Sequence, residues 1–174
     1  MVFNIPNNGK NIWEFIKQLA NGLSHLHSKE IIHGDIKPQN VLLSKENYQM
    51  ANAKLADFGS SRDKALTGKD KYEAKLYVGT KRYIPPEVLK NRTFDKSADI
   101  WAFGATIVFV CNWQHLFDTE EEIFIWTGND TSIINFSRYS VDFHVLVMSM
   151  LHPEPEKRPT AETIFDIASN KYRL

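Results

Sequence analysis

Residues 33–40 read His-Gly-Asp-Ile-Lys-Pro-Gln-Asn, and the tripeptide Asp-Phe-Gly follows at residues 57–59. Asp57 therefore lies 22 residues after Asp35. Two short apolar runs, residues 41–43 and 53–56, separate the two polar segments and predict small strands around polar turns. Acidic and amide residues are common in ordinary turns and caps, but their joint spacing here argues against that reading.

Transfer of a phosphoryl group from ATP needs three kinds of side chain, and these two segments supply all of them. A carboxylate must orient the attacking hydroxyl and accept its proton, and we expect Asp35 to be this base. A cation must offset charge on the transferring group, which is the role expected for Lys37. Hard oxygen ligands must hold Mg²⁺, and Asn40 and Asp57 provide them.

Three further motifs follow in order along the chain. Residues 79–87 read Gly-Thr-x-x-Tyr-x-x-Pro-Glu, residues 99–104 read Asp-Ile-Trp-x-x-Gly, and residues 157–160 read Lys-Arg-Pro-Thr. With the first two motifs, this order resembles the eukaryotic-type protein kinase family over about residues 11–170. The resemblance implies an α+β, mainly α fold, the C-terminal lobe of a protein kinase, in which a small β-hairpin carries the catalytic and Asp-Phe-Gly loops.

The same resemblance implies a branch, cofactors and a substrate class. At Lys37 and the pair Gly79-Thr80, the sequence resembles the Ser/Thr-specific branch of the family. This resemblance implies a protein as substrate and ATP and Mg²⁺ as cofactors. Thr80 is then expected to contact Asp35 and Lys37, and Leu42 to form the lower face of the adenine pocket.

Structural roles are also implied by the resemblance. Phe58 would stack on His33, Arg158 would pair with Glu87, and Asp99 would anchor the catalytic-loop backbone. Without the resemblance, Asp99 is only a helix N-terminal acid, and Glu87 with Arg158 is a surface pair of little consequence. The residues expected to have structural roles are His33, Phe58, Gly59, Glu87, Asp99 and Arg158.

Gly34 departs from the family pattern, which usually has Arg at that position. In the family, that Arg binds a phosphate on the activation segment. Because Gly34 replaces it, a loop phosphate would lack its main partner, and we predict little activation by loop phosphorylation. Ser60, Ser61, Thr67 and Tyr72 are candidate sites, although such residues are also ordinary in a solvated loop.

A second departure concerns the nucleotide cleft. The 174 residues contain no Gly-rich loop, no Val-Ala-x-Lys strand and no helix with the partner Glu, so we expect residues 1–174 to be the C-terminal lobe only. A truncated or inert kinase-like interaction module is therefore the main alternative. A small-molecule phosphotransferase is a minor alternative, because His-Gly-Asp-x-x-x-x-Asn also resembles aminoglycoside and choline kinases. Residues 79–87 argue against it, since such a peptide-substrate segment is not expected in those enzymes. If the upper lobe is absent, the rim near Leu42, Leu55 and Phe58 should favour dimerisation or partner binding.

Composition narrows the remaining classes of function. The 21 basic and 21 acidic residues give zero net charge, which argues against nucleic-acid and membrane-surface binding. One cysteine excludes an intrachain disulfide, and no signal peptide or membrane-spanning run is visible. We therefore expect a soluble intracellular protein, cytoplasmic or nuclear. A zinc site is disfavoured because His25, His27, Cys111 and His115 are too sparse.

Periodicity predicts a mostly helical chain. A capping-box spacing from Asn11 to Glu14 opens the first helix, and residues 97–110 predict a helix buried on nearly every face. Further helices are expected near 120–126, over 140–151 and after the cap Thr160, and residues 57–82 are expected to be a long, mobile surface segment. Five aromatic residues could form either core or a docking groove, with core preferred: Phe94, Trp113, Phe117, Phe124 and Trp126.

Overall fold

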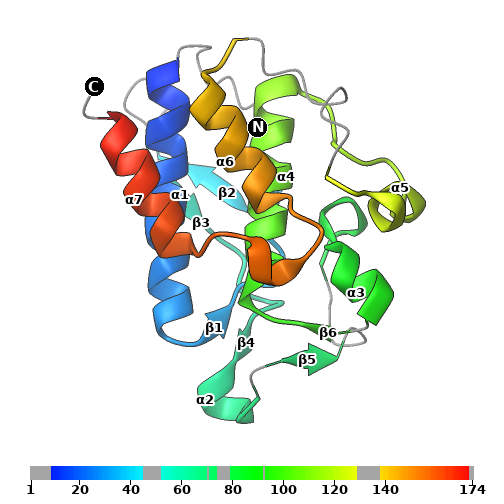
Figure 1. Cartoon of the computed structure of the whole chain (residues 1–174). Coiled ribbons are helices and arrows are strands. Elements are labelled where there is room, and N and C mark those ends of the chain that lie inside the picture. The colour runs from blue at the N-terminus through cyan, green and yellow to red at the C-terminus, as the bar shows by residue number, and fades with distance from the viewer. Residues whose placement is uncertain are drawn as a thin grey trace.

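The computed structural model describes residues 9–44, 52–69, 71–73, 79–91, 93–128 and 138–172. Within these ranges helices dominate, and the strands form three two-stranded antiparallel sheets (Figure 1). The helices are α1 Gly9–Ser28, α2 Lys64–Thr67, α3 Pro86–Asn91, α4 Lys96–Asn112, α5 Glu120–Ile125, α6 Val141–Met150 and α7 Ala161–Tyr172. The strands are β1 Ile31–Ile32, β2 Val41–Leu43, β3 Ala53–Leu55, β4 Arg62–Asp63, β5 Tyr72–Glu73 and β6 Thr93–Phe94, and single 3₁₀ turns are η1 Pro38–Asn40, η3 Lys81–Tyr83 and η4 Pro155–Lys157.

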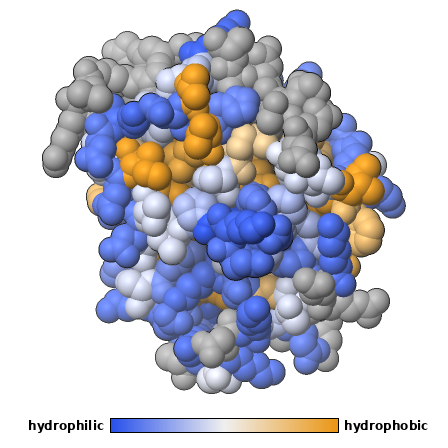
Figure 2. Space-filling view, viewed as in Figure 1, coloured by the Kyte–Doolittle hydropathy of each residue, from blue (hydrophilic) through white to orange (hydrophobic). Residues whose placement is uncertain are grey.

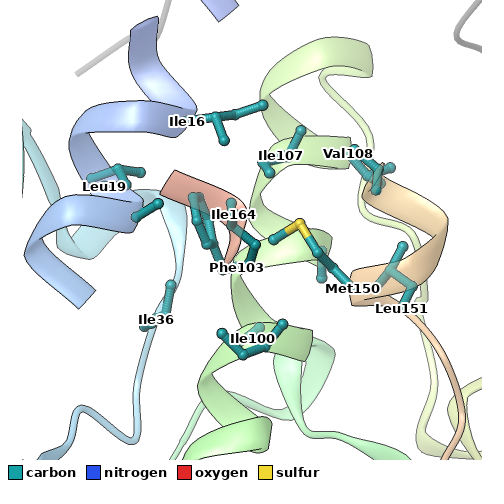
Figure 3. Packing of buried hydrophobic residues seen from close by; sticks show 14 of the residues in the cluster. Ile16, Leu19, Ile36, Ile100, Phe103, Ile107, Val108, Met150, Leu151 and Ile164 are labelled. Carbon is teal, nitrogen blue, oxygen red and sulfur yellow. The ribbon is translucent and has the colours of Figure 1, made fainter. Parts of the chain in front are cut away.

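Helix α4 is the centre of the fold, as the sequence predicts. Every residue from Ala98 to Val108 is buried, because this helix is apolar on nearly all faces. Asp95 caps its first turn by accepting a hydrogen bond from the Ser97 N–H at 2.8 Å. In Figure 3, Phe103 and Ile107 of α4 lie between Ile16 of α1 and the C-terminal end of α6.

Helix α1 begins earlier than expected, at Gly9, so Asn11 lies inside the helix and is not its cap. The capping-box interpretation is wrong, because the Glu14 carboxylate instead accepts hydrogen bonds from Lys17 at 3.0 Å and Gln18 at 2.8 Å. An apolar stripe of α1 packs against α7, which runs beside it in Figure 1. The stripe consists of Ile12, Phe15, Ile16, Leu19 and Leu23.

Strands β2 and β3 pair directly, with Val41 opposite Leu55, and this hairpin lies against α1 (Figure 1). The pairing fixes where the site residues lie, because residues 33–40 lead into β2 and residues 57–59 follow β3. Both segments therefore lie at the same end of the hairpin.

The segment 57–82 is more structured than expected over its described residues. Strand β4 pairs with β1, and β5 pairs with β6. Tyr72 is only 2% exposed and stacks on Phe94 with ring centroids 5.6 Å apart. The Tyr72 hydroxyl also bonds the Thr67 hydroxyl at 2.8 Å, so the expectation of a solvated Tyr72 is wrong. Strands β4 and β5 have only two residues each and therefore no detectable periodicity, which is why the sequence did not predict them.

The five aromatic residues divide between core and surface. Phe94, Phe117 and Trp126 are buried, which confirms the preference for core, whereas Trp113 and Phe124 are about half exposed. Figure 2 shows apolar residues gathered over α6 and α5 on a largely hydrophilic face. Among the helices described, none combines the length and hydrophobicity needed to cross a bilayer.

Candidate active site

The Asp35 carboxylate is the centre of the site, and four donors surround it. Its Oδ2 accepts the Lys37 ammonium at 2.6 Å and the Asn40 amide at 3.0 Å. Its Oδ1 accepts the backbone N–H of Thr80 at 3.1 Å and the Thr80 hydroxyl at 3.0 Å. The structure thus brings together Asp35, Lys37 and Asn40 from one loop and Thr80 from 43 residues beyond Lys37.

Local geometry explains why this loop holds its shape. Pro38 begins the single turn of η1, and the fixed φ of proline suits the first position of a helix. This turn returns Asn40 toward Asp35, where its amide also donates to the Asp35 carbonyl at 2.8 Å. The Lys37 ammonium donates to the Thr80 hydroxyl at 2.7 Å as well, so Lys37 bridges the two segments.

These contacts decide the charge of Asp35. Burial raises the pKa of the carboxyl, but hydrogen bonds from Lys37 and Thr80 and the Lys37 charge lower it more, and the net pKa lies below the ordinary value of 3.8. Asp35 is therefore ionised at neutral pH, which a proton acceptor requires.

Asp57 lies just beyond β3, is exposed and has a positive φ of 65°. Its Oδ1 accepts the Gly59 N–H at 3.3 Å. The neighbouring Ala56 N–H donates to the Asn40 carbonyl at 2.9 Å, which ties the two segments together. Asn40 has committed its amide hydrogens to Asp35, so its Oδ1 is the atom that can face a cation.

The donor set of Asn40 and Asp57 fits Mg²⁺, which binds hard oxygen atoms and usually keeps water and substrate phosphates as its other ligands. No group of three or more His, Cys, Asp or Glu side chains in the described ranges could hold a metal ion by itself. A cation at this site would consequently depend on non-protein oxygen ligands.

His33 connects the catalytic loop to the Asp57 segment. Its Nε2 lies 3.1 Å from the Ala56 carbonyl, and its Nδ1 accepts the Asp35 N–H at 3.4 Å. Both contacts are satisfied when Nε2 carries the hydrogen. The ring lies against Phe58 with centroids 5.1 Å apart, although Phe58 is half exposed.

Asp99 lies beneath the same loop and is 1% exposed. Its Oδ2 accepts the His33 N–H at 2.8 Å and its Oδ1 accepts the Gly34 N–H at 2.9 Å. Asp99 does lie in the first turn of α4, but it is more than a helix N-terminal acid, because its carboxylate is buried and bonds the loop backbone. Sequence reasoning missed a third partner, His27, whose Nε2 lies 2.9 Å from Oδ2.

Glu87 and Arg158 form a buried bidentate pair at 2.8 and 2.7 Å. The Arg158 guanidinium also lies over Trp101, 5.1 Å from the ring centroid. This pair joins α3 to the segment between η4 and α7, so it is a structural contact away from Asp35.

Gly34 occupies a position that excludes a side chain. Its φ is +80°, and a Cβ there would lie 2.7 Å from the Ser60 carbonyl oxygen. The Arg that the family usually carries at this position would require the Ser60 carbonyl to shift and would be strained at this φ. The predicted adenine-pocket residue, Leu42, is 53% exposed on β2.

The protein kinase domain family matches residues 5–168 of this chain. The chain belongs to the protein kinase domain family. It is similar to the serine/threonine-protein kinase Nek5 of Mus musculus, at 33% identity over 153 residues, which is 84% of this chain and 23% of Nek5. It is also similar to Nek8 of Danio rerio, at 35% identity over 151 residues, or 84% of this chain and 20% of Nek8.

A third relative, Nek3 of Mus musculus, is 32% identical over 153 residues, or 84% of this chain and 28% of Nek3. The chain therefore spans less than a third of the length of each of these three relatives. All three are described as serine/threonine-protein kinases, which agrees with the branch inferred from Lys37 and Thr80.

Proposed function

We propose that this kinase domain forms the phosphoryl-transfer site of a Ser/Thr protein kinase. The observation that carries the proposal is the Asp35 carboxylate, ionised and held on both oxygens by Lys37, Asn40 and Thr80. Asp35 orients an acceptor hydroxyl and takes its proton. Lys37 supplies positive charge beside the transferring group.

ATP and Mg²⁺ are the proposed cofactors. When bound, ATP supplies the γ-phosphoryl group and Mg²⁺ neutralises charge on its oxygens. Asn40 Oδ1 and the Asp57 carboxylate would hold the metal, and the exposed Leu42 would line the adenine site. We further propose that residues 1–174 provide the C-terminal lobe, to which a Gly-rich loop and a lysine-bearing strand must be added for full closure over the nucleotide.

A protein hydroxyl is the proposed acceptor. Thr80, which begins the turn η3, bonds the base directly, so an acceptor segment lying along residues 79–87 would reach Asp35. The three similar Nek proteins are described as serine/threonine kinases, which supports the same acceptor class over a small-molecule acceptor.

Nucleotide binding is tested by thermal unfolding of the chain with and without Mg-ATP. A ligand at a hundredfold excess over Kd stabilises a protein by about 2.7 kcal/mol, so a shift of several degrees is expected. Asp57→Asn should abolish the Mg²⁺-dependent part, and Asn also tolerates the positive φ at this position. Asp166→Asn, on the exposed face of α7, is the matched control. No shift at millimolar Mg-ATP would contradict ATP binding by this chain.

An interaction module is the second candidate, favoured by the exposure of Leu42 at 53% and Phe58 at 50%. Leu42 lies on β2 of the hairpin that carries the site, and Phe58 follows β3. If they join copies of the chain, light scattering should show a concentration-dependent dimer that Leu42→Glu dissolves. A clean monomer at high concentration would contradict self-association.

A further inference from the structure

Tyr72 lies in β5, within the segment that joins the Asp57 loop to residues 79–87, and the chemistry of the candidate active site does not use it. Its side chain is 2% exposed, although Lys71 and Glu73 on either side of it are exposed. We infer that Tyr72 is a positioning residue, which anchors this segment to the rest of the fold and thereby holds the acceptor wall, residues 79–87, beside Asp35.

Tyr72 belongs to a second, smaller core that is distinct from the main core around α4. Strand β5 pairs with β6 (Figure 1), and the Tyr72 ring stacks on Phe94 with centroids 5.6 Å apart and an interplanar angle of 29°. The buried members of this second core come from β1, β5, α3, β6 and α4, and they are Ile32, Tyr72, Val88, Phe94 and Ala98. Tyr72 therefore contributes a buried aromatic ring to a core that joins five elements.

Two members of the second core are continuous with the site along the chain. Ile32 directly precedes His33 of the catalytic loop, and Val88 lies in α3, directly after the acceptor wall. Ile84 packs against the same core from within the wall, four residues after Thr80. Because a close-packed core transmits displacements, the ring that fills this core fixes positions on both sides of Asp35.

A path of hydrogen bonds joins the Tyr72 hydroxyl to β4 and β1. Thr67 Oγ1 donates its hydrogen to the Asp63 carbonyl at 2.9 Å, so its oxygen must accept the Tyr72 hydroxyl hydrogen at 2.8 Å. Asp63 in β4 pairs in turn with Ile31 in β1. The ring thus connects the segment to β6, and the hydroxyl connects it to the strands before the catalytic loop. The ring makes the larger contribution, since a buried aromatic ring outweighs one neutral hydrogen bond to an exposed residue.

Hydrogen exchange of the β6 amides tests the anchoring without any enzyme activity. In Tyr72→Ala these amides should exchange about tenfold faster or more, because removal of a buried ring lowers the free energy of local opening. The amides of the β2–β3 hairpin, which lies outside the second core, should keep the parent rate. Leu66→Ala is the matched control, since Leu66 belongs to the same segment but is 85% exposed. Unchanged β6 exchange in Tyr72→Ala, or equal acceleration in β6 and the hairpin, would overturn the inference.

Two further variants separate the ring from the hydroxyl and keep the test decisive if Tyr72→Ala fails to fold. Tyr72→Phe loses only the hydroxyl, so β6 exchange should stay within about threefold of the parent, and Thr67→Val should match it. Tyr72→Leu keeps apolar volume but loses the ring, so its β6 amides should exchange faster than those of Tyr72→Phe. Exchange in Tyr72→Leu no faster than in Tyr72→Phe would overturn the role of the ring.

The consequence for the acceptor rests on the proposed function. In Tyr72→Ala, the KM for a Ser/Thr peptide should rise about fivefold or more, because the acceptor wall is displaced. The KM for Mg-ATP should stay within about twofold, because Asn40 and Asp57 lie outside the second core. A loss of folded protein alone would lower the apparent kcat and leave both KM values in place.

The outcomes for the proposed function and for Tyr72 are distinguishable. An inactive parent would refute the proposed function and leave the exchange measurement to decide the role of Tyr72. An active parent whose two KM values are unchanged in Tyr72→Ala, or change by the same factor, would overturn the positioning role alone.

Discussion

The Arg158 guanidinium donates to both carboxylate oxygens of Glu87, 71 residues away, and neither side chain is more than 6% exposed. The pair holds α3, which follows residues 79–85, against the segment that precedes α7. Since Thr80 reaches Asp35 from that first segment, the pair also helps to fix the wall of the site. Removing one partner of this pair should be strongly destabilising, because a buried charge that loses its partner has no solvent to replace it.

Arg158→Met should lower the free energy of unfolding by about 3–5 kcal/mol, because the Glu87 carboxylate is left buried and unpaired. The measurement is urea unfolding followed by tryptophan fluorescence. Lys157→Met is the control, since the neighbouring Lys157 pairs with Glu154 at the surface and should change stability little. Equal midpoints for the two variants would contradict a buried structural pair.

Gly34→Ala should destabilise the protein by about 1–3 kcal/mol, since the new Cβ meets the Ser60 carbonyl at 2.7 Å and the φ of +80° strains any side chain. Gly34→Arg should be no better, and it should not create a phosphate-responsive enzyme. Gly22→Ala is the control on α1, where a Cβ meets nothing within 4 Å. There the same substitution should raise stability by about 0.5–1 kcal/mol. Similar effects at the two glycines would show that the turn does not exclude side chains.

Lys37→Met should raise the pKa of Asp35, because its ammonium is a main reason that this pKa lies below 3.8 and burial then dominates. In the parent, ionised Asp35 is favoured in the folded state. Its stabilising contribution is therefore present above the unfolded value and lost as the pH falls through the lowered one. A carboxyl ¹³C NMR titration measures the change directly. Lys54→Met, at an exposed site on β3, should leave the titration in place, and an unmoved Asp35 in Lys37→Met would refute the cause assigned here.

The long helices could be predicted from the sequence because their periodicity is strong. Helix α4 is buried where its continuous apolar run indicated, and Ser140 and Thr160 each accept a hydrogen bond from an N–H of the first turn that follows. Strands β4 and β5 were not predicted, since two residues have no period and owe their form to partners distant in sequence. The start of α1 was placed two residues late because a capping-box spacing also occurs inside helices.

The residues of the candidate site likewise fall into those that the sequence could predict and those that it could not. Asp35, Lys37 and Asn40 could be named because their spacing within one loop carries the chemistry. The partners of Asp99 depend on how α1 and α4 pack, and a lone histidine on an amphipathic helix carries no spacing signal. His27 could therefore be found only from the structure. Likewise, the exclusion of side chains at Gly34 depends on the Ser60 carbonyl, which lies 26 residues further along the chain.

Transfer of the γ-phosphoryl of ATP to a Ser/Thr peptide, by the protein that contains these 174 residues and by its Asp35→Asn variant, tests the central claim most directly. Asp166→Asn, an exposed substitution of the same type, is the control and should transfer at the parent rate. Loss of the base should slow transfer by about 10²–10⁴-fold, while the fold and the nucleotide-induced stabilisation remain. Equal rates for the parent and Asp35→Asn, or no transfer by the parent, would contradict the assignment of Asp35 as the base of a phosphoryl-transfer site.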